Sequence, residues 1–153
     1  MRMRNRIVSS FAGYASLALA GALLVSAPAA LAAEPVALDI TDATGVKLSG
    51  DPERGAVVFK QCAACHSLKQ GENKVGPSLF GVIGRKAGTV EGFNYSKVNK
   101  ESGIDWTEQV MFEYLEKPAK TMPGTKMAFA GLKKPEDRTA VIAYIQQNGG
   151  AAQ

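Results

Sequence analysis

Apolar residues recur at helical spacing in the C-terminal part of the chain, where Val141, Tyr144 and Ile145 follow a charged start. This spacing places them on one side of an α-helix and predicts that this side is buried. The helix should have Pro135 in its first turn, where the missing N–H leaves no hydrogen bond unmade. The Asn-Gly-Gly sequence at 148–150 should end it, because glycine accepts the left-handed backbone that closes a helix.

Two further helices are predicted upstream from their boundary residues. Asp51 is a good N-cap and Pro52 suits the first helical position, so one helix should begin there and run toward the cysteines. The other should begin near Asp105 or Thr107. It should stop before Pro118, because proline disfavours helical backbone in the residue that precedes it.

The segments between these helices are rich in turn residues. Residues 69–93 contain six glycines and Pro77, which predicts irregular backbone. A short helix is expected near 96–102 and a loop over 119–133. Three or four short helices bury too little apolar surface to form a core alone. The predicted class is therefore all-α with large loops, and something else must fill the centre.

Residues 34–50 show a weak alternation of Val36, Leu38 and Ile40 before several small and turn residues. The alternation is compatible with a short strand, but no partner strand is evident downstream. We therefore expect a flexible leader, followed by a single domain over 51–150.

Residues 1–33 have the three parts of a secretory signal. A basic start is followed by an apolar stretch over 17–25, and Pro28 then precedes a run of small residues. We expect cleavage after Ala32 or Ala33 and export to the periplasm. The alternative is an uncleaved membrane anchor, because the apolar segment is long enough to span a bilayer.

The charge balance gives no indication of nucleic-acid binding. The chain has 18 basic and 14 acidic residues, for a formal net charge of +4. Three of the basic residues, Arg2, Arg4 and Arg6, lie in the signal, so the remainder is almost neutral. A near-neutral domain is not expected to bind a polyanion.

Cys62, Cys65 and His66 form the sequence Cys-Ala-Ala-Cys-His, and they are the only cysteines and the only histidine of the chain. Cys-x-x-Cys-His is the attachment signature of a c-type haem. The two thiols lie on one side of a helical turn and can form thioethers with the two vinyl groups. The histidine then follows under the ring, where it can bind iron. One covalent haem c is therefore predicted, and it would supply the missing centre of the fold.

Three other interpretations of this motif are weaker. A thioredoxin-like redox pair would need a βαβ unit, and no strand precedes these cysteines. A zinc site would need a fourth suitable ligand and would not easily use two adjacent residues. A structural disulfide leaves His66 without a role.

The sixth iron ligand cannot be a second histidine. The methionines after the signal are Met111, Met122 and Met127. Met111 lies among apolar residues of a predicted helix, where packing is the default role. Met122 and Met127 both remain candidates from the residues alone.

Four segments in succession resemble the class I cytochromes c, the family of the mitochondrial carrier and its soluble bacterial relatives. They are GPSLFGVIGRKAG, GFNYSKVNKESGIDW, YLEKPAKTMPGTKMAFAGLKK and DRTAVIAYIQ. The resemblance covers about 50–148 and implies the cytochrome c fold, with three main short helices and long loops around one haem. It also implies that Met127 is the sixth ligand and that Gly55 and Phe59 cross the last helix at Val141 and Tyr144.

The resemblance also assigns residues around the haem. Pro77 corresponds to the residue whose carbonyl accepts from the ligating imidazole. Arg85, Tyr95 and Trp106 match propionate partners, and Asn99 and Tyr114 match hydrogen-bonding residues of the crevice. Thr125 should steady the methionine loop and Phe129 should shield the haem edge.

Iron bound by both His66 and Met127 has no open position for a substrate. The expected function is therefore one-electron transfer by a carrier that is not an enzyme and binds no small-molecule substrate. The alternative is a haem enzyme or sensor, such as a small peroxidase, in which the sulfur is not bound and the iron is open.

By the same resemblance, the expected partners are membrane redox complexes. A cytochrome bc-type complex would supply the electron, and a terminal oxidase or photosynthetic reaction centre would accept it. A monomer should dock through the haem edge, ringed by lysines that would steer it toward acidic partners. These lysines are Lys60, Lys74, Lys86, Lys120, Lys126 and Lys133.

Overall fold

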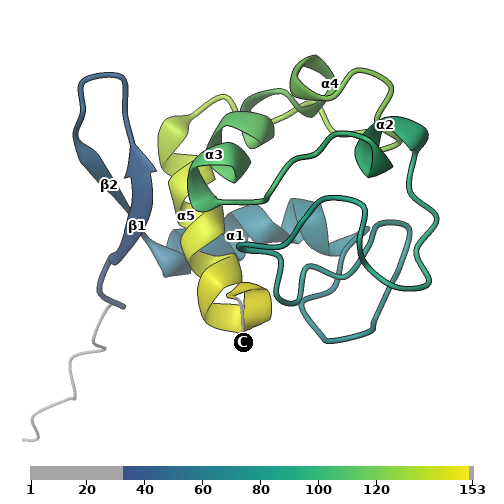
Figure 1. The fold of residues 1–153 in the computed structure, drawn as a ribbon. Helices are drawn as coiled ribbons and strands as arrows, with labels where there is room; N and C mark the ends of the chain where they lie inside the picture. Colours follow the sequence, from purple (N-terminus) through teal and green to yellow (C-terminus); the bar gives the residue numbers. More distant parts are fainter. Residues whose placement is uncertain (1–32, 152–153) are drawn as a thin grey trace, which may run out of the picture. The chain divides into compact units, whose positions relative to one another are not determined.

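The computed structural model describes residues 33–151, and the predicted signal at 1–33 falls almost wholly outside them. The described part contains a two-stranded sheet and several helices joined by long loops (Figure 1). In chain order they are β1 (Val36–Thr41), β2 (Lys47–Gly50), α1 (Pro52–Ala63), α2 (Lys97–Lys100), α3 (Glu108–Glu116), α4 (Pro118–Thr121), α5 (Pro135–Ile145) and η1 (Gln146–Gly150). No helix of residues 33–151 is both long and apolar enough to cross a membrane.

Helix α1 begins as its boundary residues predict. The carboxylate of Asp51 accepts hydrogen bonds from the N–H groups of Glu53 and Arg54, at 2.9 and 3.2 Å. These N–H groups have no partner within the helix, so the cap removes part of the cost of starting it. At the other end, the N–H groups of Cys65 and His66 both donate to the carbonyl of Cys62. The haem-attachment motif therefore begins in the last turn of α1 and continues into the tight turn that follows it.

The crossing of α1 and α5 depends on a residue without a side chain. A Cβ added at Gly55 would lie 2.1 Å from the carbonyl oxygen of Ala140 and 2.6 Å from the Cβ of Tyr144. One turn later, the rings of Phe59 and Tyr144 pack with centroids 5.2 Å apart. The expected pairing of the first and last helices is present, with Ala140 as well as Tyr144 at the closest approach.

Helix α3 also follows its predicted boundaries. The side chain of Thr107 accepts a hydrogen bond from the N–H of Val110 at 3.1 Å, and the helix ends at Glu116, before Pro118. The next segment differs from the expected loop, because Pro118 starts the short helix α4. Proline is tolerated in the first turn of a helix, so it ends α3 and opens α4.

The β1–β2 hairpin contradicts the prediction of a flexible leader over 34–50. The strands pair antiparallel, with Val36 opposite Gly50 and Thr41 opposite Lys47. The partner strand is β2, which lies within the segment itself and not downstream of it. Asp42 shapes the turn, since its side chain accepts from the N–H groups of Thr44 and Val46 at 2.8 and 3.0 Å.

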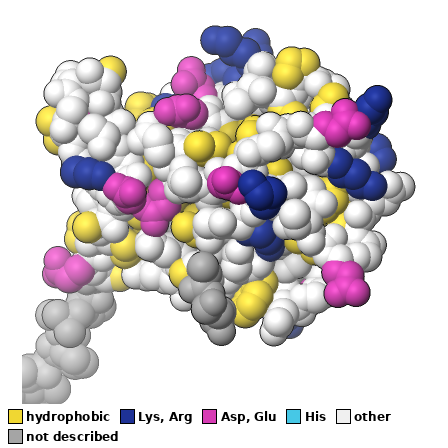
Figure 2. Space-filling model, in the orientation of Figure 1, with side chains coloured by type: hydrophobic (Ala, Val, Ile, Leu, Met, Phe, Trp, Pro, Cys, Tyr) yellow, Lys and Arg dark blue, Asp and Glu magenta, His cyan; other side chains and the backbone are white. Residues whose placement is uncertain are grey.

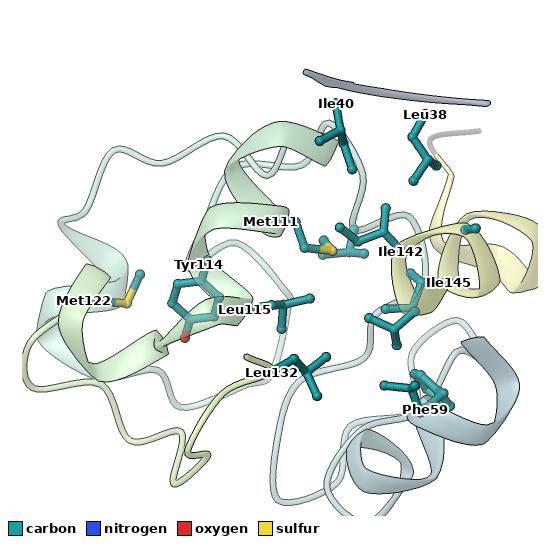
Figure 3. Packing of buried hydrophobic residues seen from close by; sticks show 14 residues of the cluster. Leu38, Ile40, Phe59, Met111, Tyr114, Leu115, Met122, Leu132, Ile142 and Ile145 are labelled. Carbon is teal, nitrogen blue, oxygen red and sulfur yellow. The ribbon is translucent and has the colours of Figure 1, made fainter. Parts of the chain in front are cut away.

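The buried core joins this hairpin to the helices (Figure 3). Ile40 of β1 and both Val141 and Ile142 of α5 are fully buried. Met111 of α3, 6% exposed, belongs to the same cluster. The loop that connects α1 to α2 contributes residues to a cavity whose wall also includes residues of α3 and α5.

Candidate haem site

One cavity of about 270 Å³ lies between the ends of α1, α3 and α5 and the long loops. All eleven residues predicted to surround a haem line it. They are Cys62, Cys65, His66, Pro77, Arg85, Tyr95, Asn99, Trp106, Tyr114, Thr125 and Met127. These residues come from five separate parts of the sequence, and the fold brings them together.

The two cysteines form no disulfide with each other and are partly buried at the cavity wall. Burial, and to a lesser extent the nearby Cys65, raises the pKa of the Cys62 thiol to about 11. A thiol of a redox Cys-x-x-Cys pair has a lowered pKa, because the thiolate is the reactive form. The environment of Cys62 does the opposite, which argues against a thioredoxin-like site.

His66 is held in the orientation that leaves one ring nitrogen for the cavity. Its Nδ1 lies 2.7 Å from the carbonyl oxygen of Pro77. Because a carbonyl can only accept, Nδ1 carries the proton, and Nε2 keeps its lone pair. Burial lowers the pKa of His66, which favours the neutral imidazole that a metal requires.

The loop that carries Pro77 approaches the imidazole closely at Gly76. A Cβ added there would lie 2.4 Å from Cε1 and 2.7 Å from Nδ1 of His66. The N–H of Gly76 also donates to the carbonyl of Cys65 at 2.8 Å. The loop therefore packs against the imidazole and fixes the orientation of the ring, including the direction in which Nε2 points.

The two methionines left open by the sequence lie in different surroundings. Met127 lines the cavity, and its sulfur is 3.4 Å from the hydroxyl of Tyr114. Its N–H donates to Oγ1 of Thr125 at 3.2 Å. Met122 is only 3% exposed, is not part of the cavity wall, and accepts a hydrogen bond from Asn99 at 3.4 Å. The geometry therefore offers the sulfur of Met127, and not that of Met122, to the cavity.

Arg85 is fixed by backbone carbonyls at the cavity wall. Its guanidinium donates to the carbonyl oxygens of Phe80 and Ser78, at 2.6 and 3.0 Å. Burial lowers the pKa of Arg85 and raises that of Tyr95, which also lines the cavity. A partly buried cation and a phenol hydroxyl provide donors for a carboxylate taken out of water, such as a haem propionate.

Asn99 supplies an independent test of whether a haem fits here. Its Oδ1 is buried without a hydrogen-bond partner, although Asn99 lines the cavity. A buried acceptor without a partner is costly, and a water molecule held beside a group bound in the cavity could donate the missing hydrogen bond. Together with two thiols, one oriented imidazole and one thioether, this donor set fits a covalently attached haem.

Several wall residues carry no signal that distinguishes them in the sequence. Leu79 and Val82 lie within the glycine-rich loop, and Met111 was assigned to packing, yet all three contribute apolar surface to the cavity. Phe129 lines the cavity, as its expected shielding role requires. Val75 is 81% exposed although it belongs to the wall, so it marks where the cavity reaches the surface.

The predicted lysines occupy different environments. Lys126 lines the cavity, and Nζ of Lys74 donates to the carbonyl of Ala63 at the end of α1 at 3.1 Å. Lys86 forms an ion pair with Asp105 at 2.8 Å. On the face in Figure 2, basic side chains are interspersed with acidic ones. Of the six lysines expected around the haem edge, only Lys126 therefore lines the cavity.

Comparisons with known proteins identify the family of the chain. The family model named Cytochrome c matches residues 52–149. Cytochrome c from Arabidopsis thaliana is 53% identical over 104 residues, which cover 67% of this chain and 93% of that protein. Cytochrome cH from Methylobacterium extorquens has a similar structure, with a TM-score of 0.61 and 39% identity over 64% of this chain and 99% of that one. The chain therefore belongs to the cytochrome c family of electron carriers, with covalent haem c attached through Cys62 and Cys65.

Proposed function

We propose that this protein is a one-electron carrier whose haem iron is bound by His66 and Met127. The observation that carries the proposal is the placement of Met127, which lines the cavity, accepts a hydrogen bond on its sulfur from Tyr114 and donates its N–H to Thr125. The bound haem supplies a ferric–ferrous couple. His66 and Met127 would both bind the iron, which would leave no position for a substrate, so the protein would act as a carrier and not as an enzyme.

The ligands and the cavity wall favour a relatively high reduction potential. A thioether is a weak, soft donor that stabilises ferrous iron more than ferric iron. Apolar side chains such as Leu79, Val82 and Leu115 surround the cavity, and a low-dielectric wall disfavours the additional ferric charge. The hydroxyl of Tyr114 donates a hydrogen bond to the sulfur of Met127, which makes this sulfur a still weaker ligand for iron.

The proposed partners are membrane redox complexes, and docking uses the surface where the cavity opens. The carrier accepts an electron from a cytochrome bc-type complex and passes it to a terminal oxidase or a photosynthetic reaction centre. Lys126 at the cavity and Lys74 near the attachment motif support an encounter with an acidic surface. The signal-like residues 1–33 support a periplasmic location, and a carrier that docks and leaves functions as a monomer.

Replacement of each candidate methionine tests the proposal. Ferric haem with a methionine ligand has a weak near-red absorption band, which disappears when the sulfur leaves the iron. Met127→Ala should abolish the band and allow turnover of peroxide. Met122→Ala, the matched control, should keep the band, because its sulfur does not line the cavity. A wild-type protein without this band that turns over peroxide rapidly would instead be an open-site haem enzyme.

A further inference from the structure

The β1–β2 hairpin is an addition to the part of the chain that matches the family, which begins at residue 52. It is nevertheless part of the folded core, because Leu38 is 5% exposed and Ile40 is fully buried. Figure 3 shows both side chains pointing from β1 toward Met111 of α3 and Ile142 of α5. The hairpin thus packs on the two helices that form one side of the haem cavity.

Directed hydrogen bonds join β1 to the first turn of α3. The N–H of Asp39 donates to Oε2 of Glu108, and the N–H of Thr41 donates to Oε1 of Gln109 at 2.8 Å. Glu108 is only 7% exposed, so its carboxylate relies on partners within the protein. The strand therefore fixes both the position and the orientation of the N-terminal end of α3.

The second strand is seated equally closely on α5. A Cβ added at Gly50 would lie 2.2 Å from the carbonyl oxygen of Thr139 and 2.8 Å from the Cβ of Ala143. The backbone of β2 therefore packs directly against α5 at Gly50, and this packing restricts movement of the strand along the helix. The hairpin consequently bridges α3 and α5 and restricts their relative movement.

The other end of α3 holds the loop that presents Met127. The hydroxyl of Tyr114 lies 3.4 Å from the sulfur of Met127, and the carbonyl of Leu115 accepts from the N–H of Leu132 at 2.7 Å. Met111 contacts the same core cluster as Ile40 and also lines the haem cavity. A continuous set of contacts therefore runs from the hairpin through α3 to the distal side of the haem.

We propose that the hairpin is a positioning element that keeps the Met127 loop closed over the haem. Ile40 and Glu108 are its positioning residues, because they connect β1 to α3, the helix whose C-terminal end contacts this loop. Opening of the loop requires α3 or its contacts to give way, and the hairpin makes that local opening rarer. The inference rests on the proposed function, in which Met127 binds the iron.

The test measures how often the sulfur leaves the iron in the full-length holoprotein. Cyanide binds ferric haem only after the methionine departs, so its binding rate at saturating cyanide reports loop opening. Ile40→Ala and Glu108→Ala should each increase this rate about tenfold, the upper part of the range for coupling through packed networks. Both should also speed hydrogen exchange of the backbone amides over residues 122–129.

Two comparisons separate positioning from general destabilisation. Glu108→Gln keeps an acceptor oxygen for the N–H of Asp39 and should restore most of the wild-type rate. Val58→Ala truncates a core residue of α1 that is 7% exposed and does not line the cavity, so it should leave the cyanide rate close to the wild-type value. Unfolding in urea measures the loss of stability in each variant.

The outcomes distinguish the hairpin proposal from the ligand proposal. If Ile40→Ala and Glu108→Ala bind cyanide no faster than Val58→Ala at a similar loss of stability, the hairpin has no positioning role. If wild-type protein binds cyanide without delay and lacks the near-red band, Met127 is not the ligand. The proposed function then fails first, and this inference fails with it.

Discussion

Gly76 and His66 show how one residue without a side chain controls the proximal side of the site. The absent Cβ lets the loop approach to within van der Waals contact of the imidazole. The carbonyl of the next residue, Pro77, then accepts a hydrogen bond from Nδ1–H, with Nδ1 and the oxygen 2.7 Å apart. That hydrogen bond fixes the tautomer and increases the donor strength of the ring. Close backbone approach and ligand orientation therefore have the same cause.

Gly76→Ala should move the loop away from the ring and weaken this hydrogen bond. The added methyl group would need to share space with Cε1 of His66, so we expect a loss of ~1–3 kcal/mol in unfolding free energy. The Nδ1 proton, followed by NMR in the ferrous holoprotein, should exchange with solvent faster than in the wild type.

Gly71→Ala is the control for the strain of an added methyl group. Gly71 has φ +71° and no atom within 4 Å of an added Cβ, so this change costs roughly 1–2 kcal/mol through the backbone alone. In the Gly71→Ala variant, the Nδ1 proton of His66 should remain protected from exchange with solvent. Equal proton exchange in both variants would show that Gly76 does not set the proximal geometry.

At the scale of elements, the crossing of α1 and α5 is the contact that orients the attachment motif. Gly55→Ala should improve the helix propensity of α1 by ~1 kcal/mol. It should nevertheless destabilise the protein, because the new Cβ meets the carbonyl of Ala140 at 2.1 Å and forces the helices apart at a cost of ~1–3 kcal/mol or more. Urea unfolding of the holoprotein measures the net change.

Val57→Ala provides the comparison on the same helix. Val57 is 62% exposed, so its truncation should change the unfolding free energy by no more than about 0.5 kcal/mol. If Gly55→Ala were as stable as Val57→Ala or more so, helix propensity would outweigh the packing contact, and the crossing would be more tolerant than its geometry indicates.

The sequence predicts those elements whose ends are set locally. The cap at Asp51, the cap at Thr107 and the proline at 135 each lie next to the helix that they start, so their effect can be recognised without the fold. The hairpin is different, because Leu38 and Ile40 are buried by helices that lie more than sixty residues further along the chain. Alternation alone could not show that such a surface exists.

The residues of the cavity wall also divide into those that a local sequence pattern predicts and those that depend on the fold. The attachment motif could be predicted because Cys-x-x-Cys-His has a recognisable spacing, and the resemblance to a family assigned Met127 and the remaining polar residues. Leu79 and Val82 have no local signal, since they are apolar residues in a loop. The carbonyl partners of Arg85 depend on how residues 78–80 turn back, which only the folded backbone determines.

At the scale of the whole molecule, the local arrangement of charge matters more than the net charge of +4. Lys126 lies at the cavity, whereas Lys47 lies on β2, where it pairs with Asp39. Charge near the docking surface steers encounter with an acidic partner, and charge elsewhere contributes little. The two lysines therefore form a matched pair for a test of docking.

Lys126→Glu should slow oxidation of the ferrous carrier by an acidic terminal oxidase about three- to tenfold at low ionic strength. Lys47→Glu changes the net charge by the same amount and should have little effect. The difference should largely disappear near 1 M salt, where the screening length is only about 3 Å. Equal slowing by both changes would show that total charge, and not a local docking surface, governs the encounter.

The most direct measurement mixes reduced wild-type holoprotein with carbon monoxide, which binds ferrous haem only at an open position. Iron bound on both sides by His66 and Met127 predicts little or no uptake at neutral pH, and slow uptake limited by departure of the sulfur. Immediate, stoichiometric binding of carbon monoxide would show that the distal position is open and would contradict the assignment of this protein as an electron carrier closed to small molecules.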